Sequence, residues 1–120
     1  MDFNEYQIAA FRTAKRMPSL AEDLNHAVIG IHTEGGEVAT EVKRALVYDA
    51  PITEDMVKHI VEELGDLLWY VALASTCLNI SLSDIAERNV AKLKKRFPEK
   101  YSNEAAEARA DKGGLDARSS

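Results

Sequence analysis

Two pairs of carboxylates constrain the fold of this chain more than any other feature. The first pair is Glu34 and Glu37, and the second is Glu63 and Asp66. Both pairs lie within helical patterns, and residues three apart on a helix share one face. If the two helices run antiparallel, the pairs meet and four negative charges converge. The sequence therefore favours a helical hairpin that brings the two pairs together.

Such a cluster needs a partner of opposite charge. Carboxylates at this spacing repel one another, and the repulsion grows as water is excluded. The positions four residues further along hold Val38, Glu41, Leu67 and Tyr70, none of which is a cation. A hard divalent cation would remove the repulsion, and Mg2+ suits carboxylate ligands best. The alternative is a solvated acidic face, the commoner fate of a glutamate-rich helix.

Gly35 and Gly36 stand between the carboxylates of the first pair. Inside a helix, each glycine costs roughly 1 kcal/mol relative to alanine. That cost is justified where another backbone or a ligand must come close. A plain kink in the helix explains the two glycines equally well.

Hydrophobic periodicity predicts four main helices. Their expected ranges are residues 2–16, 20–48, 54–78 and 82–97. Pro18, Pro51 and Pro98 mark the breaks, and Thr53 is a favourable N-cap for the third helix. No stretch alternates polar and apolar residues with the period of a strand. The predicted fold class is therefore all-α, a bundle-like arrangement of four helices.

The third helix is expected to be buried on more than one side. Its first half carries an apolar stripe that we assign to the core: Val57, Ile60, Val61, Leu64 and Leu68. Its second half, residues 67–74, is apolar all round, and such a helix must be buried on every side. A four-helix monomer of this size hardly encloses it. We therefore expect part of this surface to meet another subunit.

The composition changes after Tyr101. Residues 103–120 are alanine, glycine, serine and mostly charged side chains, with a single leucine, Leu115. Such a segment has almost nothing to bury, so we expect a disordered or loosely attached tail. The predicted organisation is one domain over residues 1–101 and a flexible tail over residues 102–120.

The bulk composition excludes several classes of protein. The 120 residues are 46% hydrophobic and 29% charged, which is typical of one soluble globular domain. The formal net charge of -5 argues against a binder of nucleic acid or of anionic membranes. One cysteine, Cys77, excludes a disulfide framework and a thiolate zinc site. Because residues 67–77 are too few to span a bilayer and residues 1–5 do not start a signal peptide, we expect a cytoplasmic protein.

Three motifs carry a resemblance to a known family. They are Glu34-x-x-Glu37, then Glu62-Glu63-Leu64-Gly65-Asp66-Leu67-Leu68-Trp69-Tyr70, and then Asn89-x-x-Lys92-Leu93-x-x-Arg96-Phe97-Pro98. In this order the chain resembles the MazG-type all-α nucleoside triphosphate pyrophosphohydrolases over roughly residues 3–101. The opening Glu5-Tyr6-Gln7 is also similar to the first helix of small single-domain members. The family motif is often written with two adjacent glutamates at its start, and Thr33 stands at the first of these positions.

The resemblance implies hydrolysis of a (deoxy)nucleoside triphosphate between the α- and β-phosphates, which yields the monophosphate and pyrophosphate. Family members use Mg2+ or Mn2+ and assemble as homodimers or homotetramers. By motif position, the metal ligands would be Glu34, Glu37, Glu63 and Asp66. We hypothesise that the metal clamps the phosphate oxygens and activates a water that attacks the α-phosphate.

Neighbours of the two carboxylate pairs are candidates for further roles. Glu41 and Glu62 are candidates for the general base, and each is equally well explained as a solvated surface glutamate. Tyr70 follows Asp66 by one helical turn, so its ring is a candidate for packing on the sugar or base of the substrate.

Asn89, Lys92 and Arg96 lie on one face of the fourth helix, because they are spaced three and four residues apart. They are candidates for binding the phosphates, where a cation would balance the leaving pyrophosphate. The alternative is that the helix dipole favours cations in the last turn of any helix.

Two rival classes remain open. Di-iron carboxylate bundles use Glu-x-x-His on two helices, whereas here the only related spacing, His59-x-x-Glu62, is reversed. A non-catalytic helical dimerisation module would leave its carboxylates solvated. Within the resembling family, phosphoribosyl-ATP pyrophosphohydrolase has a similar carboxylate arrangement, but the Asn89-to-Pro98 pattern fits the nucleotide-housecleaning branch better.

Overall fold

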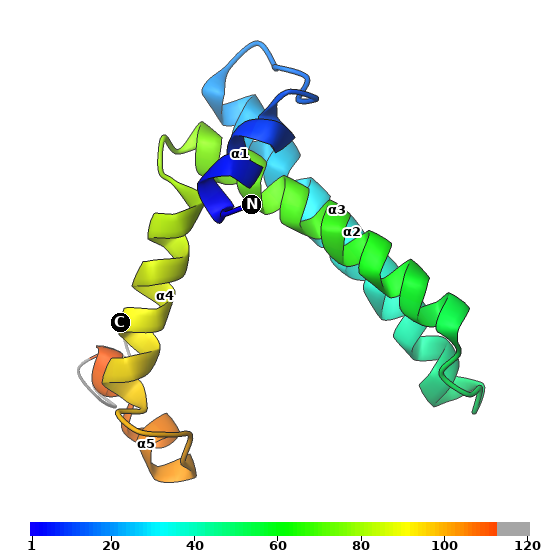
Figure 1. Ribbon diagram of the computed structural model, residues 1–120, viewed down its shortest axis with the longest axis vertical. Helices are drawn as coiled ribbons and strands as arrows, with labels where there is room; N and C mark the ends of the chain where they lie inside the picture. Colours follow the sequence, from blue (N-terminus) through cyan, green and yellow to red (C-terminus); the bar gives the residue numbers. More distant parts are fainter. Residues whose placement is uncertain (113–120) are drawn as a thin grey trace. The chain divides into compact units, whose positions relative to one another are not determined.

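The computed structural model describes residues 1–112, and all regular structure in this range is helical (Figure 1). The elements are α1 (Phe3–Phe11), α2 (Leu20–Val47), α3 (Glu54–Cys77), α4 (Leu82–Arg96), α5 (Asn103–Ala108) and a 3-10 helix, η1 (Ala110–Lys112). No strand occurs within residues 1–112, so the all-α prediction is confirmed. The chain divides into two compact units, Met1–Leu82 and a second unit that starts at Ser83.

Local side chains fix where the helices of the first unit begin. Asp2 and Glu5 form a capping box, in which each side chain accepts the backbone N–H of the other residue at 2.8 and 3.0 Å. The Ser19 hydroxyl accepts the N–H three residues ahead at the start of α2. Thr53 does the same for α3 through Met56, as predicted. The local sequence therefore determines where α1, α2 and α3 begin.

The first helix is shorter than predicted, since α1 ends at Phe11 instead of continuing to residue 16. The buried Asp23 carboxylate accepts the Met17 backbone N–H at 2.7 Å and the Arg16 Nε–H at 3.0 Å. The Arg16 guanidinium in turn lies 5.3 Å from the centre of the Phe11 ring. These contacts hold residues 12–19 as a connection onto the start of α2, and a continued helix would break them.

Helices α2 and α3 form an antiparallel hairpin and lie side by side along their length (Figure 1). The Tyr70 ring of α3 lies directly over Gly30 of α2. A Cβ atom at Gly30 would overlap with this ring. Tyr70 also meets the edge of His26, with the ring centres 5.7 Å apart. Gly30 thereby sets the spacing and the register of the hairpin.

Helix α1 packs against the second half of α3 and completes the core of the first unit (Figure 1). The cluster of buried residues consists of Ala10, Ala72 and Leu82, and Trp69 packs against it. The Trp69 Nε1–H donates to the Ala10 carbonyl at 3.0 Å and to the Thr13 hydroxyl at 3.1 Å. The Trp69 indole is thus packed against the core while its N–H group keeps hydrogen-bond partners.

The predicted core stripe on the first half of α3 is wrong for three of its five residues. Val57, Val61 and Leu64 are 48%, 60% and 47% exposed, and we call these three residues the α3 apolar stripe. Conversely, every residue of 67–74 is buried or half-buried inside the first unit, although we expected part of that surface to need another subunit. The reason is geometric. Helix α2 covers one side of α3 along its length, whereas α1 packs only against the second half of α3, so only that half is covered by two helices.

The second unit contains α4 from Ser83 onwards, α5 and η1. Ser102 caps α5 by accepting the Ala105 backbone N–H at 3.1 Å. Within the segment that we expected to be a disordered or loosely attached tail, Asn103–Ala108 form a short helix, which a capping serine and alanines support. The last eight positions of the predicted tail, 113–120, lie outside the described residues.

Within residues 1–112, no single helix is long and apolar enough to cross a membrane. The length and hydropathy required are reached only when α3 and α4 are counted together across their break.

Candidate metal centre

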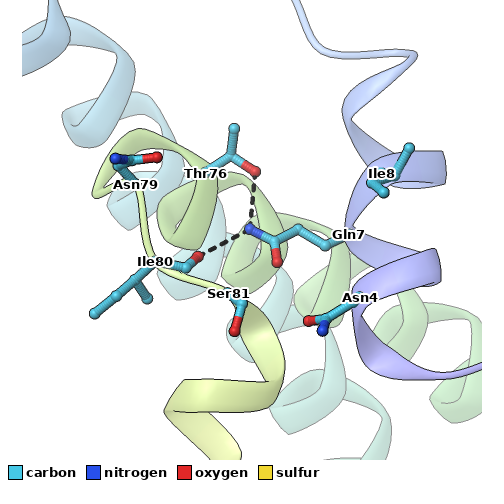
Figure 2. A pocket seen from close by; sticks show the side chains of 7 residues that line it. All are labelled: Asn4, Gln7, Ile8, Thr76, Asn79, Ile80 and Ser81. Carbon is cyan, nitrogen blue, oxygen red and sulfur yellow. Dashed lines mark hydrogen bonds between the residues drawn. The ribbon is translucent and has the colours of Figure 1, made fainter.

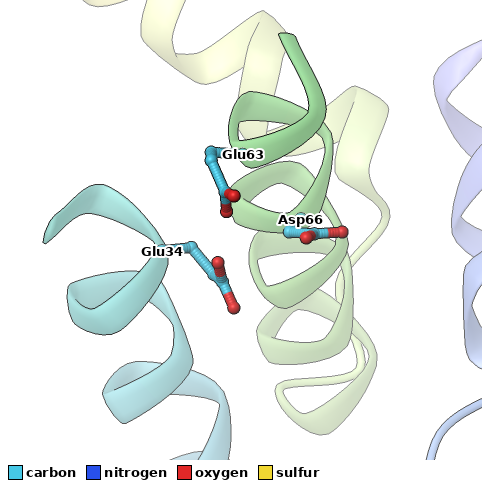
Figure 3. Close-up of side chains that lie close together, drawn as sticks. All are labelled: Glu34, Glu63 and Asp66. Atoms are coloured by element: carbon cyan, nitrogen blue, oxygen red, sulfur yellow. The ribbon is translucent and has the colours of Figure 1, made fainter. Parts of the chain in front are cut away.

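The α2–α3 hairpin brings carboxylates of both predicted pairs together. Glu34 of α2 and Glu63 of α3 point toward each other, and Asp66 lies one turn further along α3 (Figure 3). One carboxylate oxygen from each of these three residues lies within 4.8 Å of the others. We call these residues the acidic triad. Glu34 and Glu63 are half-buried, whereas Asp66 is exposed, so the triad is open to solvent on one side.

The register of the hairpin brings the two carboxylate pairs to the same level. Tyr70 lies over Gly30, and His59 lies 3.9 Å from Glu41. Residues of α2 and α3 on the same level therefore have numbers that sum to about 100. This places Glu34 level with Asp66, and Glu37 level with Glu63.

Glu37, the fourth predicted ligand, is exposed and does not join the triad. Its negative charge still contributes to the raised pKa of Glu63. Glu37 therefore lies at the edge of the acidic triad.

The electrostatics of the triad show an excess of negative charge. The pKa of Glu63 is raised, first because its carboxyl shares a hydrogen bond with Glu34. Burial and the charges of Glu34, Asp66 and Glu37 raise it further. Among residues 1–112, no Lys or Arg forms an ion pair with any member of the triad. The carboxylates of the triad therefore repel one another and favour a positive charge between them.

The donor set fits a hard divalent cation. All three groups supply carboxylate oxygens, the ligand type that Mg2+ and Mn2+ prefer. No histidine or cysteine within the described residues joins the triad, which disfavours softer metals. The arrangement found is therefore a candidate acidic metal site.

Three glycines next to the carboxylates in the sequence face open space. A Cβ atom at Gly35, Gly36 or Gly65 would meet nothing within 4 Å. Helix α2 continues through Gly35 and Gly36 without a break. The surface of both helices is therefore open at these three glycines, which adjoin carboxylate residues in the sequence.

Tyr6 is a residue near the triad to which sequence reasoning assigned no role. Burial raises the pKa of its phenol, and the negative charge of Asp66 raises it further. The phenol of α1 therefore lies within electrostatic reach of the triad, at the edge formed by Asp66. The signal in the sequence was the Glu5-Tyr6-Gln7 segment, whose side chains had no predicted partner on α3.

The other candidates on the hairpin lie apart from the triad. Glu41 is mostly buried, with Arg44 Nη1 and His59 Nδ1 each 3.9 Å from its carboxylate. Glu62 is exposed and belongs to no carboxylate group that the structure brings together among residues 1–112. Tyr70 uses its ring to pack α2 against α3, as described above.

The three candidates on α4 differ in their surroundings. Asn89 and Lys92 are exposed side chains. Arg96 is half-buried and is held by a carboxylate of the same unit, Asp111. No signal in the sequence predicted that partner, because Asp111 lies in the segment that we assigned to a disordered tail.

A separate pocket of about 310 Å³ lies between α1 and the end of α3 (Figure 2). Its lining is uncharged and consists of Asn4, Gln7, Ile8, Thr76, Asn79, Ile80 and Ser81. The Gln7 amide donates to the Thr76 hydroxyl at 3.2 Å and to the Ile80 carbonyl at 3.0 Å (Figure 2). Its oxygen accepts the Leu82 backbone N–H at 2.7 Å. Gln7 thus uses its hydrogen-bonding capacity to hold residues 78–82 against α1.

Comparisons with known proteins agree with this geometry. Residues 24–101 match the model of the MazG nucleotide pyrophosphohydrolase domain, and this range contains both carboxylate pairs. The chain is also 37% identical over 102 residues to the Gene 37 protein of Mycobacterium phage L5, which covers 80% of this chain and 89% of that protein. No solved structure matches the chain. The chain therefore belongs to the MazG nucleotide pyrophosphohydrolase domain family.

Proposed function

We propose that the protein hydrolyses (deoxy)nucleoside triphosphates between the α- and β-phosphates in a Mg2+-dependent reaction. A water attacks the α-phosphorus, the bond to the bridging oxygen breaks, and the products are the monophosphate and pyrophosphate. The observation that carries this proposal is the acidic triad within a MazG domain. A triphosphate brings about four negative charges, so an acidic site accepts it only together with cations.

Glu34, Glu63 and Asp66 are the residues that would hold Mg2+ or Mn2+, and Glu37 completes the set at the edge. When bound, the metal supplies charge neutralisation for the phosphates and polarises the attacking water. The chain itself contributes the preorganised oxygens and the open space beside Gly35, Gly36 and Gly65. A metal would bind the ionised carboxylate of Glu63.

The remaining roles follow from the side chains outside the triad. Glu41 and Glu62 both stay candidates for the general base: Glu41 is mostly buried near His59 of α3, and Glu62 is exposed. Asn89, Lys92 and Arg96 are proposed contacts to the phosphates. Tyr70 is proposed to act on the sugar or base only through an accessible edge of its ring, because one face is covered by Gly30.

Self-association and a cytoplasmic location are part of the same proposal. The α3 apolar stripe supports the former, since Val57, Val61 and Leu64 follow one line along the helix and each is about half exposed. The stripe lies on the same helix as Glu63 and Asp66. A second copy that covers it would also bring further side chains toward the triad.

The triad argues for this function over a di-iron carboxylate protein. Di-iron bundles need histidine ligands, and the three side chains brought together here are all carboxylates. If no triphosphate is turned over, the alternative is a non-catalytic helical module.

The proposed function is tested with a panel of canonical and modified triphosphates in the presence of Mg2+, by measuring pyrophosphate, monophosphate and orthophosphate. We expect pyrophosphate as the primary product. Glu34→Gln and Asp66→Asn should each lower kcat/KM by roughly 100-fold or more, because even outer-shell partners of a metal contribute up to that much. Glu99→Gln, an exposed acid outside the helices, is the matched control and should leave the rate unchanged.

A second measurement separates lost metal binding from misfolding. Mg2+ should raise the melting temperature of the wild-type chain but not that of Glu63→Gln. Without metal, Glu63→Gln should melt no lower than the wild type, since the substitution removes one of the repelling charges. Full Mg2+-dependent turnover by Glu34→Gln or Asp66→Asn would refute the site assignment, and orthophosphate as the primary product would refute α–β cleavage.

A further inference from the structure

Arg96 and Asp111 form a two-pronged ion pair in the second unit. Arg96 Nε donates to Asp111 Oδ1 at 2.7 Å, and Arg96 Nη2 donates to Asp111 Oδ2 at 3.0 Å. The Asp111 side chain is 1% exposed and the Arg96 side chain is 21% exposed. The chain turns at Pro98 and returns along α5, so that η1 lies beside the end of α4 (Figure 1). The two residues are therefore held together by the fold of this unit.

The geometry of the pair is the one by which arginine binds phosphate. Two parallel N–H···O bonds from one edge of a guanidinium recognise either a carboxylate or two oxygens of a phosphate group. The Asp111 carboxylate occupies both donors of that edge, Nε and Nη2 of Arg96. A phosphate oxygen pair can use the same edge of Arg96 only after Asp111 leaves.

A second arginine adds positive charge at the same place. Arg109 lies two residues before Asp111 in the left-handed backbone region, with φ of 50°. Its Nε is buried and has no hydrogen-bond partner in the described part of the chain. The charges of Arg96 and Arg109 both lower the pKa of Asp111, with the hydrogen bond from Arg96 as the largest cause. The Arg96 guanidinium thus holds the carboxylate, the charge of Arg109 also acts on it, and the Arg109 Nε–H has no partner among the described residues.

We propose that Arg96 and Arg109 form a phosphate-binding site whose internal occupant is Asp111. The α5–η1 segment then competes with the phosphates of the substrate, or with pyrophosphate, for Arg96. This inference rests on the proposed function in one respect, the role of Arg96 as a phosphate contact. Arg109 becomes a further phosphate ligand, and its Nε–H, which has no partner among the described residues, is the donor that it would offer.

The consequence is a lowered apparent affinity for phosphates. A ligand that needs free Arg96 binds with a dissociation constant divided by the fraction of molecules in which Asp111 has left. Removal of the competing carboxylate should therefore tighten binding without any new contact. The expected gain is about fivefold, the factor that corresponds to a partly exposed ion pair.

The test uses the full chain without divalent metal and measures the binding of inorganic pyrophosphate by calorimetry. Under these conditions the acidic triad repels the ligand, so the signal reports on the arginines. Asp111→Asn should bind pyrophosphate about fivefold more tightly than the wild type. Glu107→Gln is the matched control, because it removes one exposed negative charge from α5 and leaves the ion pair intact. Arg96→Met and Arg109→Met, each combined with Asp111→Asn, should abolish the gain.

Two further measurements keep the test decisive. Asp111→Glu keeps the charge and should bind pyrophosphate no more tightly than the wild type, and circular dichroism should show equal helix content in all variants. If Asp111→Asn disordered α5, Arg96 would still be released and the gain would still be expected. An affinity of Asp111→Asn equal to that of Glu107→Gln overturns the inference.

Steady-state kinetics with Mg2+ and triphosphate separate this inference from the proposed function. We expect Asp111→Asn to lower KM at unchanged kcat. If no variant turns over but Asp111→Asn still binds pyrophosphate more tightly, the proposed function is wrong and the anion site stands. If all variants turn over and neither KM nor pyrophosphate binding changes in Asp111→Asn, the inference is wrong and the proposed function stands.

Discussion

The buried carboxyl of Asp23 and the half-buried carboxyl of Glu63 respond to their surroundings in opposite directions. The pKa of Asp23 is lowered because the Met17 backbone N–H and the Arg16 guanidinium both stabilise the ionised form. The pKa of Glu63 is raised because its nearest partner is another carboxylate. Burial opposes ionisation in both cases, so the neighbours decide the sign. Asp23 is therefore a structural anchor, whereas Glu63 belongs to a carboxylate cluster with which no Lys or Arg of residues 1–112 forms an ion pair.

We expect Asp23→Asn to destabilise the folded chain at neutral pH, because the amide loses the ion pair with Arg16 and weakens the bond from Met17. A lowered folded-state pKa contributes stability above the ordinary value of 3.8, and this contribution is lost as the pH falls through the folded-state pKa. The difference in free energy of unfolding between wild type and Asp23→Asn should therefore shrink on acidification. Urea unfolding at several pH values measures it.

Arg16→Met is the control for the Asp23 experiment. The Arg16 side chain is 62% exposed, so its removal should cost less than Asp23→Asn. Met17 would still donate to the carboxylate in this variant. Equal losses for the two variants would show that the ion pair, and not the buried carboxylate with its backbone bond, carries the anchor.

At the scale of single helices, α2 contains glycines with different physical roles. Gly30 lets the Tyr70 ring of α3 come close, and its absent Cβ sets the distance between the two helices. Gly35 and Gly36 face open space, so nothing within the described residues requires glycine there. Their cost in helix stability is then explained by something that approaches from outside the first unit, which is consistent with a substrate beside the acidic triad.

Gly35→Ala and Gly36→Ala should each raise the free energy of unfolding by about 1 kcal/mol, because alanine favours the helix and meets no atom. If the substrate uses the space, the same variants should lose turnover while they gain stability. Gly30→Ala is the contrasting variant and should destabilise by about 1–3 kcal/mol through overlap with Tyr70. Urea unfolding and the pyrophosphate assay measure the two effects separately. Unchanged turnover in Gly35→Ala and Gly36→Ala would show that the open space at these two residues plays no role in catalysis.

At the scale of the whole molecule, the first unit leaves one side of the α2–α3 hairpin uncovered. Two helices bury only the faces that they turn toward each other, and α1 covers only the second half of α3. Val57, Val61 and Leu64 remain about half exposed as a result. A second copy of the chain is the proposed cover, as expected for a member of this family.

We expect sedimentation equilibrium to give a mass two or four times the chain mass of 13.3 kDa. Val61→Glu should shift the mass toward the single chain, because it places a charge in the middle of the α3 apolar stripe. Ile8→Glu adds the same charge at a residue of α1 that is 76% exposed, and should leave the mass unchanged. A wild-type mass of 13.3 kDa at micromolar concentration would contradict self-association.

Much of the helical architecture could be predicted because local interactions determine it. Caps at Ser19 and Thr53 and the proline breaks place α2 and α3 within a residue of the predicted ranges. The family was likewise readable from the order of short motifs, since it depends on spacing along the chain. The predicted end of α1 was wrong, because it depends on a contact that is not local. Asp23, seven residues after Arg16, binds Arg16 and Met17 and holds the connection between α1 and α2 out of the helix.

The sequence by itself determined the helices, the spacing of the carboxylates and hence the possibility of a metal site, because these properties depend on neighbours within a few residues. Only the tertiary structure decided which carboxylates meet. The hairpin register, set where Tyr70 lies over Gly30, brings the two pairs to the same level, and side-chain packing then brings Glu34, Glu63 and Asp66 together and leaves Glu37 exposed. It also decided which face of α3 stays exposed, since burial depends on where a partner helix ends. The pairing of residues distant in the chain is a property of packing, and no local pattern encodes it.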